Sequence, residues 1–225
     1  MNAATQAVAV AARPRGGRPS RADAALLRQR ILDAATELML DQGYGATSIE
    51  AIAARAGVSK RTLYHRFADK AELVQAVVAR IVDGARAGSL DALPKGLAAR
   101  EALRQFGVAT LRAALQPQVL ALYRLIISES GRFPDLLRAV SLSGGRAQAV
   151  RMLAPLLRSE WPRLRAADAD FAAQQYLQLL VSLPQLRAMG IGEPMDDEAC
   201  RAWVDHSLQL LLQGLRGLAG EATAA

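Results

Sequence analysis

Residues Thr47 to Phe67 read TSIEAIAARAGVSKRTLYHRF, and this stretch decides the fold that we expect for the chain. Thr47 followed three residues later by Glu50 has the spacing of a capping box, which predicts the start of a helix. Gly57 can take the left-handed conformation that ends such a helix, and Ser59 can cap the next one. The stretch therefore predicts a helix, a sharp turn and a second short helix, which together form a helix-turn-helix.

The second helix of this unit has one apolar face and one polar face. Val58, Leu63 and Phe67 recur at helical spacing and are predicted to face inward. The side chains left outside are basic, hydroxyl-bearing or aromatic: Lys60, Arg61, Thr62, Tyr64 and His65. A short, hydroxyl-capped helix that exposes such side chains suits the major groove of DNA.

Many positions around this unit agree at fixed spacing with one known pattern. They are Arg30-Ile31-Leu32-Asp33-Ala34-Ala35, Gly43-Tyr44, Thr47, Ile52-Ala53, Ala56-Gly57-Val58-Ser59, Leu63-Tyr64, Phe67, Lys70 and Leu73. Over about residues 24–84 the chain resembles the DNA-binding domain of the TetR/AcrR family of bacterial transcription regulators. The resemblance implies a three-helix DNA-binding head, with its helix-turn-helix at residues 47–66.

The family pattern implies roles for individual residues of this chain. Side chains on the exposed recognition helix would read base edges or nearby phosphates: Lys60, Arg61, Thr62 and His65. Tyr64, Thr47 and Lys70 match positions that usually contact backbone phosphate, and Lys70 also lies at a helix N-terminus, which favours an anion. For each residue the alternative is ordinary surface exposure. The expected DNA-binding residues are Arg18, Thr47, Ser48, Ser59, Lys60, Arg61, Thr62, Tyr64, His65 and Lys70.

The chain is basic, and much of its positive charge lies at the amino end. Across 225 residues, Lys and Arg total 28 and Asp and Glu total 21. Residues 1–30 hold six arginines and one aspartate, and such a segment beside a helix-turn-helix attracts phosphate. Gly17-Arg18-Pro19 resembles the core of arms that enter the minor groove. We therefore expect residues 1–23 to be a flexible basic arm that reaches DNA; an arm that is only solvated is the alternative.

Beyond the head, the apolar spacing predicts only helices, and no strand-like alternation or internal repeat occurs. A capping-box spacing at Asp69 and Glu72 starts a fourth helix that runs to about Ala85. Later helices are predicted at about 97–115, 118–130, 134–158 (bent at Gly144-Gly145), 167–188 and 196–215. The expected fold is all-α with about nine helices, in which residues 24–84 form the head and residues 85–225 a second domain.

The segment from Leu122 to Leu136, LYRLIISESGRFPDL, resembles the corresponding segment of AefR-type C-terminal domains in the same family. This implies an effector-binding domain whose last two helices, at about 167–188 and 196–215, form a four-helix bundle with a second copy. A pocket between helices five to eight would be lined by Phe106, Leu122, Ile126, Trp161 and Tyr176, although such side chains equally suit an apolar core. Arg124 or Glu129 could meet a charged ligand, or could pair with solvent or with each other.

The same sequence argues against several other classes of protein. The lone cysteine, Cys200, excludes an intrachain disulfide and fits a reducing cytoplasm, with a redox role as the weaker alternative. No apolar run approaches the ~18 residues of a membrane span. His65 and His206 belong to no Cys/His cluster, so we expect no metal and no cofactor. No paired nucleophile and base is placed, so we expect no enzyme.

Together these patterns predict a cytoplasmic, sequence-specific DNA-binding regulator of transcription. We expect a homodimeric repressor that a small apolar or amphipathic effector releases from a palindromic DNA operator. The alternative is a constitutive DNA-binding dimer, or an activator, without an effector pocket.

Overall fold

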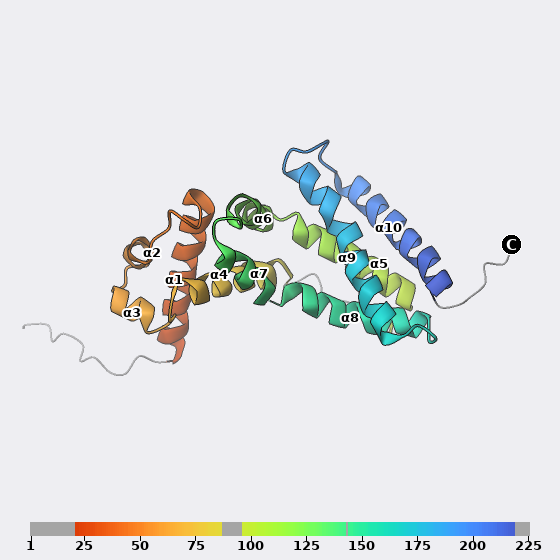
Figure 1. The fold of residues 1–225 in the computed structure, drawn as a ribbon, viewed down its shortest axis with the longest axis horizontal. Helices are drawn as coiled ribbons and strands as arrows, with labels where there is room; N and C mark the ends of the chain where they lie inside the picture. The colour runs from red at the N-terminus through yellow and green to blue at the C-terminus, as the bar shows by residue number, and fades with distance from the viewer. Residues whose placement is uncertain (1–20, 87–95, 143, 219–225) are drawn as a thin grey trace, which may run out of the picture.

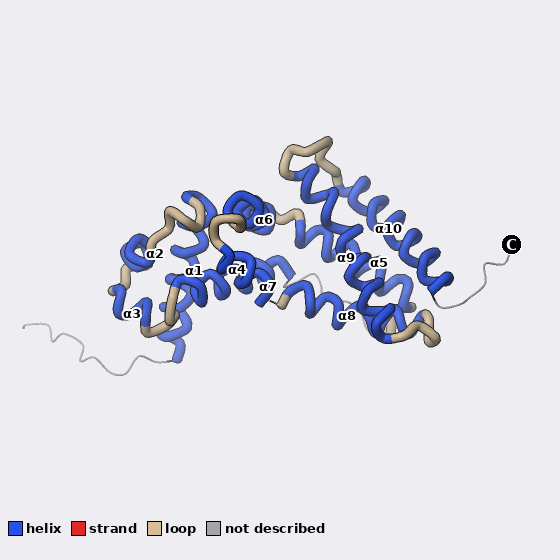
Figure 2. Tube along the Cα trace, viewed as in Figure 1, coloured by secondary structure: helices blue, strands red, loops and turns tan. Residues whose placement is uncertain are grey.

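The computed structural model describes residues 21–86, 96–142 and 144–218. Within these ranges the chain forms ten helices and no strand (Figures 1 and 2). They are α1 (Arg21–Gln42), α2 (Ile49–Ala56), α3 (Lys60–Tyr64), α4 (Lys70–Arg86), α5 (Ala99–Ala114), α6 (Pro117–Glu129), α7 (Pro134–Leu142), α8 (Gly145–Glu160), α9 (Ala166–Ala188) and α10 (Asp197–Leu218).

The prediction of an all-α fold with about nine helices is confirmed. The single bent helix predicted over residues 134–158 is wrong, because this part of the chain forms two helices, α7 and α8. Gly144 has a φ of 71° and precedes the first residue of α8, so its left-handed backbone starts a new helix. None of the described helices is both long and apolar enough to cross a membrane.

The head consists of α1, α2 and α3, with α4 packed against α1 (Figure 1). The centre of its hydrophobic core is formed by Ile31, Ile52, Leu63 and Phe67, each at most 1% exposed. The last two come from α3 and the turn after it, so burial of Leu63 and Phe67 fixes which face of α3 is turned to the outside. The helical spacing of the apolar residues predicted this orientation.

Local hydrogen bonds define both ends of the turn between α2 and α3. Gly57 ends α2 with a φ of 64°, as predicted. Ser59 caps α3, because its Oγ accepts a hydrogen bond of 3.1 Å from the Thr62 backbone N–H. The predicted cap of α2 is wrong by one residue: Ser48 is the cap and accepts from Ala51 N at 3.0 Å.

The fourth helix starts where it was predicted, with one of the two hydrogen bonds of a capping box. Asp69 Oδ1 accepts a hydrogen bond of 2.8 Å from the Glu72 backbone N–H. The Glu72 carboxylate in turn accepts one of 2.6 Å from the Ala68 backbone N–H. The first of these bonds belongs to a capping box, whereas the second goes to Ala68 instead of to Asp69 itself. Together they hold the chain at the start of α4, whose first residue is Lys70.

The buried apolar residues form two clusters that do not follow the order of the chain. The first joins the head and α4 to four side chains of α6 and α7: Leu122, Leu125, Leu136 and Ala139. The second consists of residues of α5, α8, α9 and α10, together with Trp161 and Leu164 from the segment between α8 and α9. In Figure 1 the head lies at one end of an elongated molecule and the helices α5, α8, α9 and α10 lie at the other, with α4, α6 and α7 between them.

Candidate nucleic-acid interface

The recognition helix α3 presents a charged and polar face to the outside. Lys60, Arg61 and His65 are exposed, and the Tyr64 ring is 50% exposed. Leu63 between them is fully buried. The structure thus brings four predicted contact residues to one accessible surface, next to the N-terminus of α2.

The two hydroxyl groups predicted to meet DNA on α3 are also used inside the helix. Ser59 Oγ lies 2.8 Å from Thr62 Oγ1, in addition to its hydrogen bond with the Thr62 backbone. Ser59 remains exposed and Thr62 is half-buried. Their first role is therefore to hold the amino end of α3, where backbone N–H groups favour an anion.

Lys60 is not free on this surface, because its ammonium forms an ion pair of 2.5 Å with Glu50 in the first turn of α2. The hydrogen bond from Lys60 lowers the pKa of the Glu50 carboxyl group below its ordinary value. Glu50 had been assigned only a capping role from the sequence. A phosphate that binds Lys60 has to compete with this carboxylate, whose pair is exposed and therefore weak.

Arg30 of α1 stabilises the turn from the other side. Its Nη2 donates a hydrogen bond of 2.5 Å to the Ala56 carbonyl oxygen, at the last residue of α2. A cation at a helix C-terminus satisfies a carbonyl that has no partner within the helix. Arg30 belongs to the sequence pattern of the TetR/AcrR resemblance, but the sequence alone gave it no role. Its partner Ala56 is 26 positions away, so the contact becomes visible only in the folded chain.

Lys70 begins α4 and is half-buried. Its Nζ donates a hydrogen bond of 2.6 Å to the Tyr44 carbonyl oxygen and lies 4.0 Å from the centre of the Tyr44 ring. Burial lowers the pKa of the Lys70 ammonium group, and the nearby Glu129 carboxylate opposes that shift. The cation predicted to touch phosphate is thus held against the turn between α1 and α2.

Three other predicted DNA-binding residues differ in their accessibility. Ser48 is exposed at the N-terminus of α2. Thr47 is only 1% exposed, and its hydroxyl donates to the Gly43 carbonyl oxygen at 2.7 Å. In this conformation Thr47 has almost no surface to offer a phosphate. Arg18 lies outside the described residues.

The structure does not bring the five predicted pocket residues together. Leu122 and Ile126 pack in the first apolar cluster, with the head. Phe106, Trp161 and Tyr176 pack in the second, and each is at most 6% exposed. Glu129 was considered as a contact for a charged effector. In the structure its carboxylate accepts a hydrogen bond from the Gly45 backbone N–H of the head.

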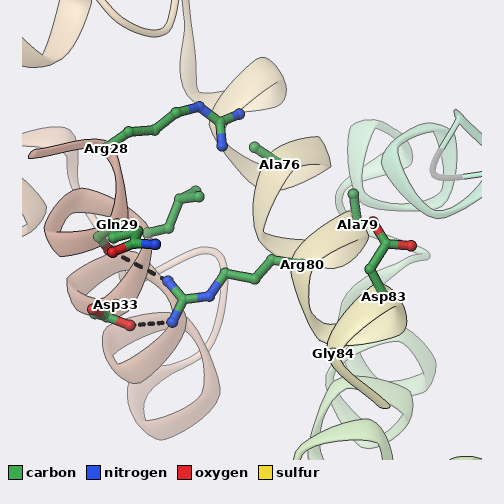
Figure 3. A pocket seen from close by; sticks show the side chains of 9 residues that line it. Arg28, Gln29, Asp33, Ala76, Ala79, Arg80, Asp83 and Gly84 are labelled. Atoms are coloured by element: carbon green, nitrogen blue, oxygen red, sulfur yellow. Dashed lines mark hydrogen bonds and ion pairs between the residues drawn. The ribbon is translucent and has the colours of Figure 1, made fainter. Parts of the chain in front are cut away.

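Within the described residues, hollows lie elsewhere, away from those five residues. One of about 820 Å³ opens between α1 and α4, where Arg80 pairs with Asp33 and donates to the Gln29 carbonyl oxygen (Figure 3). One of about 650 Å³ lies along α8 and the start of α9. A third of about 550 Å³ is lined by residues of α1, α4 and the start of α6.

Comparison with known proteins agrees with the geometry of the head. Residues 31–77 match the sequence profile of bacterial regulatory proteins of the tetR family. Residues 101–214, half of the chain, match that of the AefR-like transcriptional repressor C-terminal domain. The chain belongs to the TetR family of bacterial regulatory proteins. It is a transcriptional regulator with a helix-turn-helix DNA-binding domain, not an enzyme.

Relatives of this TetR-family regulator match either part or most of the chain. The solved structure of the flavonoid-responsive regulator FrrA is 34% identical, with 84% of this chain and 97% of FrrA covered and a TM-score of 0.68. The regulator AlkX of Mycobacterium tuberculosis is 29% identical over 72% of this chain and 76% of AlkX. The transcriptional activator FasR of Mycolicibacterium smegmatis is 43% identical, over 41% of this chain and 43% of FasR.

Proposed function

We propose that this chain is a homodimeric repressor that binds a palindromic operator and leaves it when a small amphipathic molecule binds. The observation that carries the DNA-binding part is the recognition helix. Its polar face is exposed because Leu63 and Phe67 are buried, and Ser59 caps its amino end. Such a helix presents both base-reading side chains and an electropositive end to a major groove.

Two copies of the head would enter successive major grooves on one face of the duplex, ~34–36 Å apart. Arg61 and His65 are the candidates for base edges. Lys60, Tyr64, Ser48 and Lys70 are the candidates for phosphate, once Lys60 has exchanged Glu50 for the DNA backbone. A protein that binds the chromosome in this way works in the cytoplasm.

The test is a comparison of specific and non-specific DNA. Fragments selected by the pure protein from its own promoter region supply the operator, and a shuffled duplex of equal length supplies the control. Fluorescence anisotropy at ~150 mM salt should give at least 1,000-fold tighter binding to the operator, with affinity that falls steeply as salt rises. Equal affinity for both duplexes contradicts the proposal.

Apolar side chains on the last two long helices support the dimer. Phe171 of α9 is 57% exposed, Leu179 and Leu183 on the same helix are each 38% exposed, and Leu210 of α10 is 62% exposed. In a monomer such side chains would remain in water, whereas a second copy would bury them. A two-fold contact through these helices uses the same surface on both copies.

One similarity supports repression and another supports release by a ligand. The C-terminal profile that spans residues 101–214 is described as that of a transcriptional repressor. FrrA, 34% identical over most of both chains, is described as flavonoid-responsive. We infer an effector of the same broad kind, an aromatic molecule with polar edges. Titration of a flavonoid into the protein–operator complex should lower the anisotropy, because a ligand that prefers the unbound conformation shifts the equilibrium towards it.

The second candidate is a regulator whose DNA binding no effector controls, or an activator. It is favoured by the burial of Phe106, Trp161 and Tyr176 in a packed core, and FasR is named an activator. The two candidates differ in one result. A protein that stays on its operator with every member of a flavonoid and fatty-acid panel is of the second kind, whereas dissociation by one member supports the first.

A further inference from the structure

The turn between α6 and α7 reaches across to the head and holds the turn between α1 and α2. Glu129, the last residue of α6, accepts a hydrogen bond of 2.8 Å from the Gly45 backbone N–H, 84 positions earlier in the chain. Phe133 packs edge-on against the Tyr44 ring, with centroids 5.1 Å apart and planes 78° apart. One polar and one aromatic contact thus connect the two turns, and aromatic pairs of this geometry are favourable.

The two glycines of the α1–α2 turn show how close this approach is. A Cβ at Gly45 would lie 2.7 Å from Cζ of Phe133, and Gly45 does not have the positive φ that demands glycine. The close approach of the Phe133 ring is therefore sufficient to explain why a glycine occupies position 45. A Cβ at Gly43 would collide with Oε1 of Glu129, and Gly43 also has a φ of 88°.

The held turn is joined to both helix ends that we expect at the DNA backbone. The Tyr44 carbonyl oxygen accepts from Lys70 at the start of α4. The Gly43 carbonyl oxygen accepts from Thr47, the residue before the cap of α2. Tyr44 itself is 6% exposed. A shift of the α1–α2 turn must therefore move the amino ends of α2 and α4 with it.

We propose that Glu129 and Phe133 are positioning residues for operator binding, which fix the orientation of the head on the rest of the chain. Neither residue touches DNA. Both act by restricting the head, so that two recognition helices in a dimer keep one separation. This inference rests on the proposed dimeric DNA binding, and it names the contact through which movement of α6 and α7 reaches the head.

The spacing of operator half-sites measures this restriction directly. A rigid pair of heads binds well to half-sites at one separation and poorly when base pairs are added between them. Loosely attached heads tolerate the added base pairs, but they bind the natural operator more weakly, because binding must then order them. Non-specific binding depends on charge, so it should be unchanged in Phe133→Ala and equal in Glu129→Ala and Glu129→Gln, which lose the same charge.

The variants are Glu129→Ala, Glu129→Gln and Phe133→Ala in the full-length protein, with Glu160→Ala as the control. Glu160 is an exposed glutamate at the last residue of α8, as Glu129 is at the last residue of α6. Gln keeps an oxygen that can accept from Gly45, so Glu129→Gln and the control should behave like the natural protein. Anisotropy is measured with the operator, with the operator carrying two additional central base pairs, and with shuffled DNA.

Glu129→Ala and Phe133→Ala should weaken operator binding about tenfold, the effect of losing an interaction of ordinary hydrogen-bond strength. The penalty for the two added base pairs should shrink, while the circular dichroism spectrum stays the same. The affinity for shuffled DNA should stay at the natural value in Phe133→Ala and at the Glu129→Gln value in Glu129→Ala. If Glu129→Ala keeps the operator affinity and the full spacing penalty, or Glu129→Gln loses them, the inference is wrong. Failure of the natural protein to prefer its operator would instead contradict the proposed function itself.

Discussion

Ser59 determines how the recognition helix begins. α3 has five residues, so it contains few internal hydrogen bonds and depends on its cap more than a long helix does. Ser59 Oγ accepts from the Thr62 backbone N–H and also pairs with the Thr62 hydroxyl. Both contacts lie at the end of α3 that we expect to point at DNA.

Replacement of this cap should affect both stability and DNA binding. Ser59→Ala should lower the free energy of unfolding by about 1 kcal/mol, the usual cost of losing a serine cap, and should weaken operator binding. The matched control is Ser159→Ala, because Ser159 is an exposed serine whose hydroxyl only donates to the Leu156 carbonyl oxygen within α8. Urea unfolding and operator anisotropy are measured for both variants. If Ser59→Ala unfolds at the same urea concentration as Ser159→Ala, the cap contributes nothing to stability.

Caps of this kind could be predicted from the sequence because they depend on neighbours a few residues away. Gly57 and Ser59 were assigned correctly for that reason. Thr47 and Ser48 are adjacent hydroxyl residues, and local spacing favoured the wrong one as the cap. The choice depends on a contact outside the helix, since the Thr47 hydroxyl turns back to the Gly43 carbonyl oxygen.

Tyr176 is the largest fully buried side chain in the second cluster. Its hydroxyl donates a hydrogen bond of 3.2 Å to the Leu103 carbonyl oxygen and joins α9 to α5. Burial raises the pKa of the Tyr176 hydroxyl above its ordinary value. Because the folded pKa lies above the unfolded pKa of about 10, the folded state keeps the proton that the unfolded state releases. This contribution is complete below about pH 10 and is lost as the pH rises towards the folded pKa.

Tyr176→Phe separates these two effects. Near neutral pH the variant should be less stable by about 1 kcal/mol, the value of one buried hydrogen bond. Above about pH 10 its stability should fall less steeply than that of the natural protein, because the phenylalanine has no proton to lose. Urea midpoints across this range test both statements, with Tyr64→Phe at an exposed ring as the control. Parallel curves for Tyr176→Phe and the natural protein would contradict the role assigned to the proton.

At the scale of whole helices, α9 shows why its faces were hard to assign from the sequence. Phe171 is a large apolar residue and yet is 57% exposed, while the small residues Ala169, Ala172 and Ala173 fill the contact with the core. α9 is apolar on more than one side, so periodicity alone does not say which side meets its own chain. A second apolar side is what a helix needs if it also packs against another copy.

The proposed dimer predicts a specific effect of charge on α10. Leu210→Glu should produce a monomer at low micromolar concentration, because a carboxylate buried without a partner costs several kcal/mol. Operator binding should fall at least 100-fold, since a single head contacts only one half-site. Leu142→Glu is the control, because Leu142 is comparably exposed, at 60%, but ends α7. Sedimentation of both variants gives the masses, and a dimer that survives Leu210→Glu would remove α10 from the interface.

At the scale of the molecule, the apolar clusters do not coincide with the division expected near residue 84. The head and α4 share their core with Leu122, Leu125, Leu136 and Ala139 of α6 and α7. Sequence spacing identified the helices and the inward-facing residues of the head. It could not show that α6 and α7 turn back to the head, because that contact joins residues 84 positions apart, as Gly45 and Glu129 do.

This shared core predicts that a fragment of residues 1–86 is much less stable than the same residues in the full chain. The fragment leaves Val74, Val77, Val78 and Ile81 of α4 without the α6 and α7 side chains of their cluster. Each large apolar side chain that loses its burial costs about 1.5–3 kcal/mol, so the total loss approaches the whole stability of a small domain. Amide hydrogen exchange in α1 and α4 should be at least 100-fold faster in the fragment.

Leu136→Ala in the full chain should accelerate exchange in the same helices through a loss of about 2–5 kcal/mol. Equal protection of α1 in the fragment, the variant and the natural chain would mean that the head is stable without α6 and α7.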